Sequence, residues 1–228
     1  MTAHAQPRAT LELLHGGAGV APAGDHASGT ETGDVQMAGV AAAFRSFLES
    51  LGLDLEDPDL AGTDHRVARA YREMLSGLRP GAEPRLSTFP NRERYAGIVS
   101  VTGIPFYSMC AHHFLPFFGT AHVGYLPGTW LLGLSKFSRV VDFYARRPQL
   151  QERLTEQVAA LLEERLAPNG LIVSVEARHL CMEMRGVSRP HVITTTMAVR
   201  GAFQDERLQR QFLAQLHGVR GPSTDEEA

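Results

Sequence analysis

The order of strand-like and helix-like hydrophobic patterns constrains the fold of this chain most strongly. Two segments rich in β-branched and aromatic residues, 98–107 and 119–126, predict strands. Helical spacing of apolar residues follows at 135–146 and 148–166, and two further strand-like segments then lie at 171–178 and 192–203. Strand pairs that flank a helix pair predict an antiparallel sheet with its helices on one face, which is an α+β architecture.

A four-stranded sheet of this kind has two open edges, whose backbone groups lack partners. Closing the sheets of several subunits into a barrel removes such edges. The order of elements therefore predicts that the chain assembles with copies of itself.

The 228 residues are expected to divide into four parts. Residues 1–34 are rich in Gly, Ala and His and lack aromatic residues, which predicts a flexible extension. Residues 35–94 predict an added helical region, and residues 95–205 predict the core. Residues 206–228 are expected to hold the end of a C-terminal helix and an acidic tail.

Local signals predict where several helices begin. In the added region, helices are expected over 35–51 and 65–78, with Thr63 or Asp64 capping the second. Ser135 is expected to cap the helix that follows it, and Pro148 to occupy the first turn of the next one.

Composition excludes several classes of function. Twenty-two basic residues against twenty-five acidic ones leave a net charge of −3, which argues against a nucleic-acid polymer as partner. No apolar run reaches about 18 residues, so no membrane span is expected. The N-terminus lacks a basic segment followed by an apolar one, and two cysteines are too few for a disulfide-stapled secreted fold. We therefore expect a cytoplasmic protein.

Both cysteines lie close to histidines. Cys110 and His113 are three residues apart after one predicted strand, and His179 and Cys181 are two apart at the end of another. Cys110, His113 and Cys181 form a Cys2His set, which leaves a fourth tetrahedral position open, as in catalytic zinc sites. His112 and His179 are then imidazoles suited to proton transfer near neutral pH.

Two other interpretations of the cysteines remain open at this point. Buried cysteines often act only as small apolar residues, and the spacing alone favours neither that role nor a metal site. A disulfide between Cys110 and Cys181 is less expected without a secretion signal. The coincidence of three histidines with both cysteines in two short segments favours the metal site.

Three further segments carry candidate binding groups. Lys136 is the only lysine, and it stands with Ser135 and Arg139 at a predicted helix start, where anions bind well. Gln151 and Glu152 together match the donor edge of guanine, although a Glu in a first helical turn is also ordinary helix chemistry. The third segment holds Arg185, which is either a phosphate contact or a simple surface residue.

Taken together, these segments resemble the GTP cyclohydrolase I family over about residues 36–205. The matching motifs are Ser108-Met-Cys-x-His-His113, Gly124-Tyr-Leu-Pro127, Gly133-Leu-Ser-Lys136, Arg146-Arg-Pro-Gln-Leu-Gln-Glu-Arg-Leu154, His179-x-Cys181, Met184-Arg-Gly186 and the Thr194-Thr-Thr run. The resemblance implies a tunnelling fold, in which β-β-α-α-β-β subunits close into a toroid, commonly a decamer. It also implies active sites between subunits.

The resemblance further implies a reaction and a set of roles. GTP is hydrolysed at C8 of guanine, formate leaves, and the remainder rearranges to 7,8-dihydroneopterin triphosphate. Zn²⁺ on the Cys2His set activates a water. The implied roles are proton transfer for His112 and His179, ribose chemistry for Ser135, guanine binding for Gln151 and Glu152, and triphosphate binding for Lys136, Arg139, Arg185 and Arg66.

One position departs from the family pattern. Ala111 stands where the family usually has Glu, which removes a negative charge beside the metal loop. This departure leaves a paralogue that acts on a related purine nucleotide as one alternative, and a non-catalytic pterin- or nucleotide-binding scaffold as another. The related nitrile reductase of the queuosine pathway needs a cysteine nucleophile, whereas both cysteines here are better explained as ligands.

Overall fold

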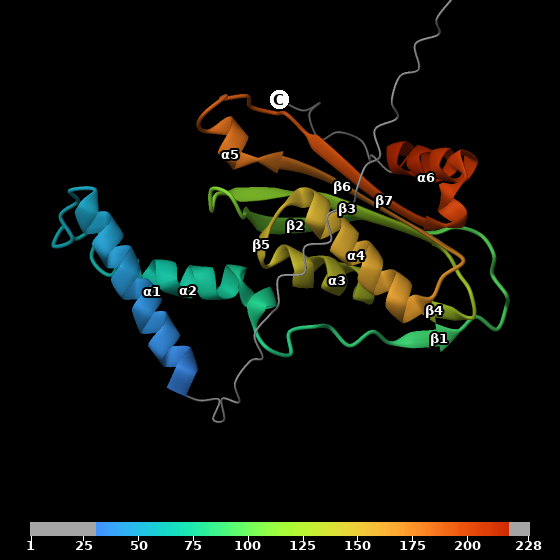
Figure 1. The fold of residues 1–228 in the computed structure, drawn as a ribbon, viewed down its shortest axis with the longest axis horizontal. Helices are drawn as coiled ribbons and strands as arrows, with labels where there is room; N and C mark the ends of the chain where they lie inside the picture. Colours follow the sequence, from blue (N-terminus) through green and yellow to red (C-terminus); the bar gives the residue numbers. More distant parts are fainter. Residues whose placement is uncertain (1–30, 219–228) are drawn as a thin grey trace, which may run out of the picture.

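A computed structural model describes residues 31–218 as a mixed α+β fold built on a curled five-stranded sheet (Figure 1). The expected N-terminal extension up to residue 30 and the acidic tail from residue 219 lie outside the described residues. The strand order is β5-β2-β3-β6-β7. These strands are β2 (Val99–Cys110), β3 (Pro116–Leu126), β5 (Pro148–Gln149), β6 (Gly170–His179) and β7 (Thr194–Gly201).

The predicted order of two strands, two helices and two strands is confirmed. β2, β3, β6 and β7 pair antiparallel in sequence order, and α3 (Ser135–Ala145) and α4 (Gln151–Leu166) lie between the two strand pairs along the chain. The two helices pack on one face of the sheet. Buried apolar residues on one side of each helix pack against alternate residues of the strands. The helix residues include Phe137, Val141, Leu154 and Val158, and the strand residues include Phe106, Val123 and Val173.

The start of α4 differs from the prediction. Pro148 and Gln149 do not begin the helix but form β5, which pairs in parallel with the last residues of β2. Ala111 N donates to Gln149 O at 2.9 Å, so this pairing satisfies backbone groups at the sheet edge. Proline is tolerated there because an edge strand does not need its missing N–H. Consequently α4 starts beside the end of β2.

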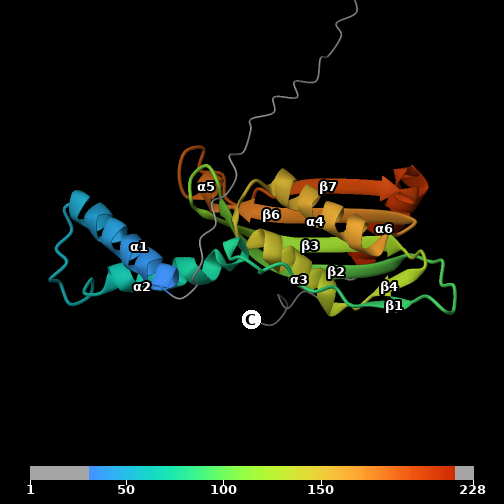
Figure 2. The ribbon, with the colours of Figure 1, turned by 60° about the horizontal axis from the view of Figure 1, so that its bottom comes forward.

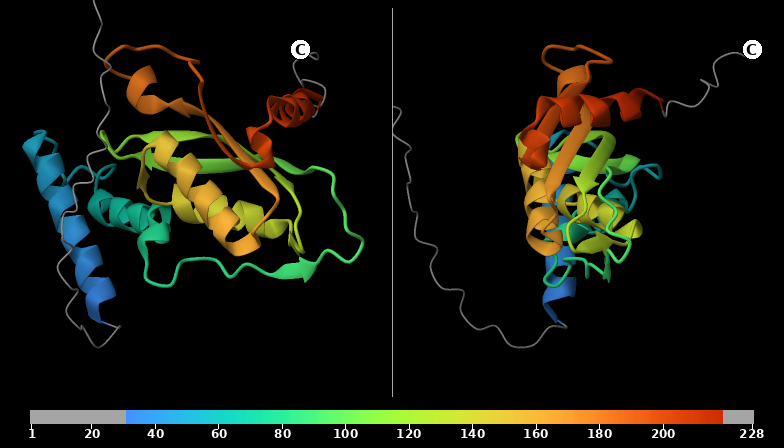
Figure 3. Two further views of the ribbon diagram at one scale, coloured as in Figure 1. Left: turned by 45° about the vertical axis from the view of Figure 1, so that its right-hand side comes forward. Right: turned by 90° about the vertical axis from the view of Figure 1, so that its right-hand side faces the viewer.

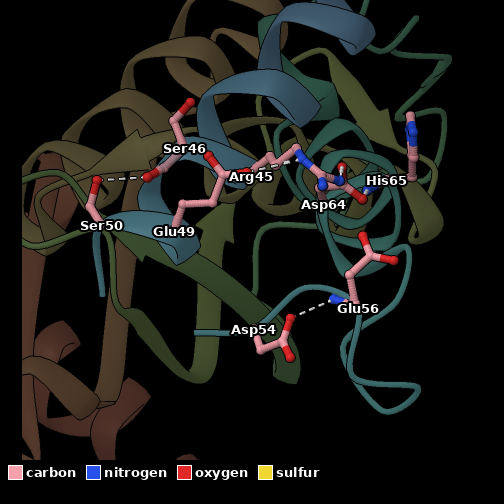
Figure 4. Close-up of polar contacts among 8 residues, drawn as sticks. All are labelled: Arg45, Ser46, Glu49, Ser50, Asp54, Glu56, Asp64 and His65. Carbon is pink, nitrogen blue, oxygen red and sulfur yellow. Dashed lines mark hydrogen bonds and ion pairs between the residues drawn. The ribbon is translucent and has the colours of Figure 1, made fainter. Parts of the chain in front are cut away.

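Two predicted helix caps are wrong. α2 (Thr63–Met74) is preceded by Gly62 at φ 71°, with no side-chain cap from Thr63 or Asp64, and Ser135 is the first residue of α3 without a capping hydrogen bond. Asp64 is instead buried and faces Arg45 of α1 (Glu31–Ser50), with Nη1 and Oδ2 3.8 Å apart (Figure 4). A contact between helices thus replaces the local cap.

The helices do not all lie on one face. α6 (Glu206–Gly218) packs on the opposite face from α3 and α4 (Figures 1 and 3). Its Phe212 joins Ile172 of β6 and Phe203 in a second, smaller buried cluster. Ile172 alternates with Leu171 and Val173, which face α3 and α4, so β6 is apolar on both sides.

Helices α1 and α2 project from one end of the sheet (Figures 1 and 2). Between them runs an apolar groove of about 300 Å³, lined by Val40, Ala43, Phe44, Phe47, Val67 and Tyr71. The side chain of Phe47 is 53% exposed, although it is large and apolar. This hairpin therefore leaves apolar surface uncovered in a single chain.

Short elements complete the fold. At the end of the sheet away from α1 and α2, β1 and β4 pair with each other (Figures 1 and 2). The bounds are β1 (Thr88–Pro90), β4 (Trp130–Leu132), α5 (Leu180–Glu183) and two 3-10 turns, Ser76–Leu78 and Ala202–Gln204. Within residues 31–218, no helix has the length and apolar character needed to cross a membrane.

Close contact between β3 and β6 depends on Gly119. A Cβ at this position would lie 1.9 Å from Glu176 O and 2.7 Å from Ala177 Cα. We expect Gly119→Ala to force the strands apart and to destabilise the fold by about 1–3 kcal/mol or more. Gly39→Ala is the control, because nothing lies within 4 Å of its added Cβ and alanine favours helix. Thermal unfolding followed by circular dichroism should show a lower midpoint for Gly119→Ala only, and equal midpoints would contradict the close contact.

Candidate metal centre

The structure brings Cys110, His113 and Cys181 together. One possible ligand atom from each lies within 4.8 Å of the others, and Cys110 Sγ is 3.8 Å from His113 Nδ1. Cys110 ends β2, His113 lies in the following loop, and Cys181 lies in α5. Cys110 is buried, Cys181 is half-buried, and His113 is exposed.

Backbone hydrogen bonds shape the loop that carries His113. Cys110 N donates to Leu115 O, and Phe114 N donates to Cys110 O, both at 2.9 Å. Phe114 takes a left-handed conformation at φ 52° to close this tight turn. Its ring also stacks with Tyr71 of α2 at a centroid distance of 6.3 Å, so α2 borders the loop. The turn thus directs Cys110 and His113 to the same side.

An ion pair fixes the segment that carries Cys181. Arg178, near the end of β6, donates from Nε and Nη2 to the two carboxylate oxygens of Glu183 at 2.8 and 2.6 Å. Bidentate contacts of this kind fix the relative orientation of the two side chains in addition to pairing their charges. The hydrogen bond from Arg178 holds the pKa of the Glu183 carboxyl below its usual value. Because Glu183 ends α5, this pair ties Cys181 to the sheet.

The three residues fit a metal ion of the zinc type. Thiolate and imidazole ligands about 2.3 and 2.0 Å from zinc lie roughly 3.5 Å apart in a tetrahedron, close to the separation found here. Burial, followed by the neighbouring Cys110 thiol, raises the pKa of the Cys181 thiol. A bound cation would reverse this effect by stabilising both thiolates. Three protein ligands leave one position for a non-protein ligand.

Two further histidines border the cluster. The exposed His112 lies next to His113, with ring centroids 6.2 Å apart. His179 is half-buried, and its ring stacks on Phe117 at 4.7 Å with an interplanar angle of 2°. Burial lowers the pKa of His179, and the nearby carboxylates of Glu152 and Glu183 oppose this shift.

The two candidate guanine ligands have different surroundings. Glu152 is exposed in the first turn of α4, close enough to His179 to act on its pKa. Gln151 is 2% exposed, and its amide nitrogen donates to Val175 O and Thr194 O. A direct contact between Gln151 and guanine would have to displace these internal hydrogen bonds.

The candidate phosphate ligands are spread over the fold. Phe137, in the first turn of α3, packs on Tyr125, which pairs with Val99 at the start of β2. Ser135 and Lys136 therefore lie near the end of the sheet opposite Cys110, and β2 itself is roughly 35 Å long. Arg139 lines an open cavity of about 490 Å³ with Arg79, Asp142 and Arg146 among others.

Of the remaining two arginines, Arg185 lies near the metal cluster. Arg185 follows α5, and its charge acts to lower the pKa of Cys181. The side chain of Arg66 on α2 donates to Ala61 O at 2.8 Å and Thr63 Oγ1 at 2.6 Å, within its own helix start. One chain thus gathers the metal cluster, both histidines, Glu152 and Arg185, but not Ser135 or Lys136.

Several residues around the site were not singled out from the sequence. Thr155 and Thr196 lie behind Gln151, their hydroxyls 2.6 Å apart, and Phe117 supports His179. Thr155 and Thr196 are 41 residues apart, so no local spacing connects them. The run of threonines that includes Thr196 was the only signal, and it indicated no role.

Comparison with known proteins gives a consistent result. The family model of GTP cyclohydrolase I matches residues 40–217. The chain is 46% identical over 188 residues to GTP cyclohydrolase 1 of Mycolicibacterium gilvum, covering 82% of this chain and 93% of that protein. Identity to GTP cyclohydrolase 1 is 51% for Mycolicibacterium paratuberculosis, covering 74% and 83% of the two chains, and 48% for Mycobacteroides abscessus, covering 83% and 94%.

Proposed function

The chain belongs to the GTP cyclohydrolase I family, and on this premise we propose that it hydrolyses GTP at C8 of guanine and rearranges the product to 7,8-dihydroneopterin triphosphate. The observation that carries the proposal is the Cys110, His113 and Cys181 cluster, with His112, His179 and Glu152 around it. A binding scaffold has no need of an open metal position beside two proton-transfer groups.

The overall reaction sets what the site must do. One water adds at C8 and opens the bond to N9, and a second water releases C8 as formate. The ribose then rearranges, and its carbonyl condenses with the exposed amine, which returns one water. The site must therefore bind guanine, move several protons and hold the triphosphate in place.

We assign a Zn²⁺ ion to Cys110, His113 and Cys181. When bound, it supplies a Lewis acid that lowers the pKa of a water to about 7. Cys110 contributes from a buried strand end and Cys181 from the segment tied down by Arg178 and Glu183, so two of the three ligands are rigidly held. Rigidly held ligands would fix the position of the ion relative to the bound substrate.

The chain's own residues take the other roles. The Glu152 carboxylate is exposed at the start of α4 and accepts hydrogen bonds from the guanine N1–H and amino group. His112 and His179 give and take protons as the ring opens. Arg185 holds the phosphates on the same side of the chain as the metal cluster. Arg66 is a weaker phosphate candidate, because its guanidinium is already engaged within its own helix.

Neighbouring subunits complete the site in this proposal. Ser135 and Lys136 lie at the far end of the sheet from Cys110, so they serve the metal cluster of an adjacent copy, Ser135 in the ribose steps and Lys136, with Arg139, at the triphosphate. Within residues 31–218, the outer edges of β2 and β7 are unpaired along most of their length, and the α1–α2 groove is apolar. These surfaces support a tunnelling fold closed into a toroidal homo-oligomer, a decamer in line with the family resemblance.

The compartment follows from the same chemistry. Both cysteines are free thiols in the structure and are needed as ligands, which suits a reducing environment. We therefore place the activity in the cytoplasm.

Ala111 favours one second candidate, a paralogue that acts on a related purine nucleotide. The backbone N–H of Ala111 donates a hydrogen bond to Gln149 O, while its methyl group replaces the carboxylate usual in the family. The loss of that charge beside the cluster changes the local field that both metal and substrate experience.

One assay separates these candidates. Zinc-loaded protein is incubated with GTP, while formate and the pterin absorbance are followed together. We expect both products in equal amounts. Formate without pterin, or turnover only of another purine nucleotide, would favour the paralogue. Bound zinc with no turnover of any purine nucleotide would refute the proposed activity.

A further inference from the structure

A buried hydrogen-bond network lies behind His179, and its other members, Gln151, Thr155 and Thr196, have no part in the mechanism proposed above. It joins Gln151 and Thr155 of α4 to Thr196 of β7 and to His179 at the end of β6. Gln151 and Thr155 are 2% and 1% exposed, so water does not compete for their hydrogen bonds.

The orientation of the Gln151 amide follows from its partners. Its nitrogen lies 3.0 Å from Val175 O and 2.9 Å from Thr194 O. Backbone carbonyl oxygens only accept hydrogen bonds, so the amide NH2 must face them. The amide oxygen therefore faces His179 Nε2, which is 2.8 Å away. Because that oxygen only accepts, His179 Nε2 carries a hydrogen and donates it.

The two threonines fix the same orientation from behind. Thr155 Oγ1 donates to Gln151 O at 2.9 Å, which uses its only hydrogen. The 2.6 Å contact between the hydroxyls must then run from Thr196 to Thr155. Thr196 Oγ1 is left with lone pairs toward the Gln151 amide nitrogen, 3.2 Å away. A reversed amide would place its oxygen against two carbonyl oxygens, which is strongly unfavourable.

We propose that Gln151, Thr155 and Thr196 are positioning residues that fix the orientation and the tautomer of the His179 ring, with its hydrogen on Nε2 and none on Nδ1. Stacking on Phe117 fixes the plane of the ring. Within residues 31–218, no protein group hydrogen-bonds to His179 Nδ1. This inference rests on the proposed function, and it gives Gln151 a role through His179 in place of a guanine contact.

Steady-state kinetics of the zinc-loaded, full-length protein provide the first test. Gln151→Leu should lower kcat about 10- to 100-fold, as is usual when the partner of an active-site histidine is lost, with KM for GTP and zinc content nearly unchanged. A direct guanine contact predicts the opposite, a raised KM with kcat retained, and that result would overturn the inference.

Threonine variants keep the test decisive if Gln151→Leu does not fold. Thr196→Val should lower kcat in the same way. Thr196→Ser should keep kcat near the wild-type value, because serine keeps the hydroxyl. Thr195→Val is the matched control, since Thr195 is exposed and points to the other side of β7. Equal kcat values for Thr196→Val and Thr195→Val would contradict a positioning role.

Solid-state NMR of sedimented protein, with ¹⁵N in the histidine rings, tests the tautomer without reference to turnover. His179→Ala identifies the His179 signals by their loss. The wild-type spectrum should show a hydrogen on Nε2 and a bare Nδ1 for this ring. A hydrogen on Nδ1 would overturn the inference, whether or not GTP is converted. Failure of the formate assay with the expected spectrum would instead refute only the proposed function.

Discussion

Cys181→Ala is expected to abolish both metal binding and turnover. The variant keeps one thiolate and one imidazole, too few ligands to retain a catalytic zinc ion at low micromolar concentrations. Loss of a metal that contributes several kcal/mol of transition-state stabilisation lowers kcat/KM by at least about a thousandfold. Zinc content by mass spectrometry and formate release from GTP are the measurements.

Met182→Ala is the matched control for this variant. Met182 follows Cys181 in the same short helix and is exposed. Its replacement by alanine truncates a neighbouring side chain without removing a ligand. It should keep its zinc and most of its activity. Full activity of Cys181→Ala, or zinc loss in both variants, would contradict the assignment of Cys181 as a ligand.

The adjacent histidines His112 and His113 should respond differently to the same substitution. His113 Nδ1 lies 3.8 Å from Cys110 Sγ, so His113→Ala should lose the metal and all turnover. His112 is outside the ligand cluster, so His112→Ala should keep the metal while turnover falls about 10²- to 10⁴-fold, the usual contribution of a proton-transfer group.

The same two measurements, zinc content and formate release, distinguish the pair. Circular dichroism checks that both variants are folded, which is expected because both histidines are exposed. Zinc retained by His113→Ala together with zinc lost by His112→Ala would exchange the two roles. Unchanged turnover in His112→Ala would remove it from the mechanism.

The sequence predicted the strands and helices well where their periodicity was long. Boundaries that depend on distant partners were not predictable in this way. Pro148 carries the local signal of a helix start, but pairing of Gln149 with Cys110 makes a strand there instead. Asp64 carries the signal of a cap, but Arg45 of another helix faces it. In each case a contact between segments far apart in the chain prevails over a local preference.

The candidate site shows the same division. Cys110 and His113 are close in sequence, and the structure brings Cys181 to them as expected from its position at a strand end. The family resemblance implied a guanine contact for Gln151, whereas the residues that surround its side chain could not be identified from the sequence. They are Val175, Thr194 and Thr196, which only the folded sheet brings together.

X-ray absorption at the zinc edge tests the central claim most directly, because it reports the atoms around the metal in the intact, zinc-loaded protein. Two cysteines, one histidine and an open position predict two sulfur atoms at about 2.3 Å and two nitrogen or oxygen atoms at about 2.0 Å. The Cys181→Ala spectrum should lose one sulfur or all bound zinc. A wild-type spectrum with fewer than two sulfur atoms would contradict the metal centre on which this account depends.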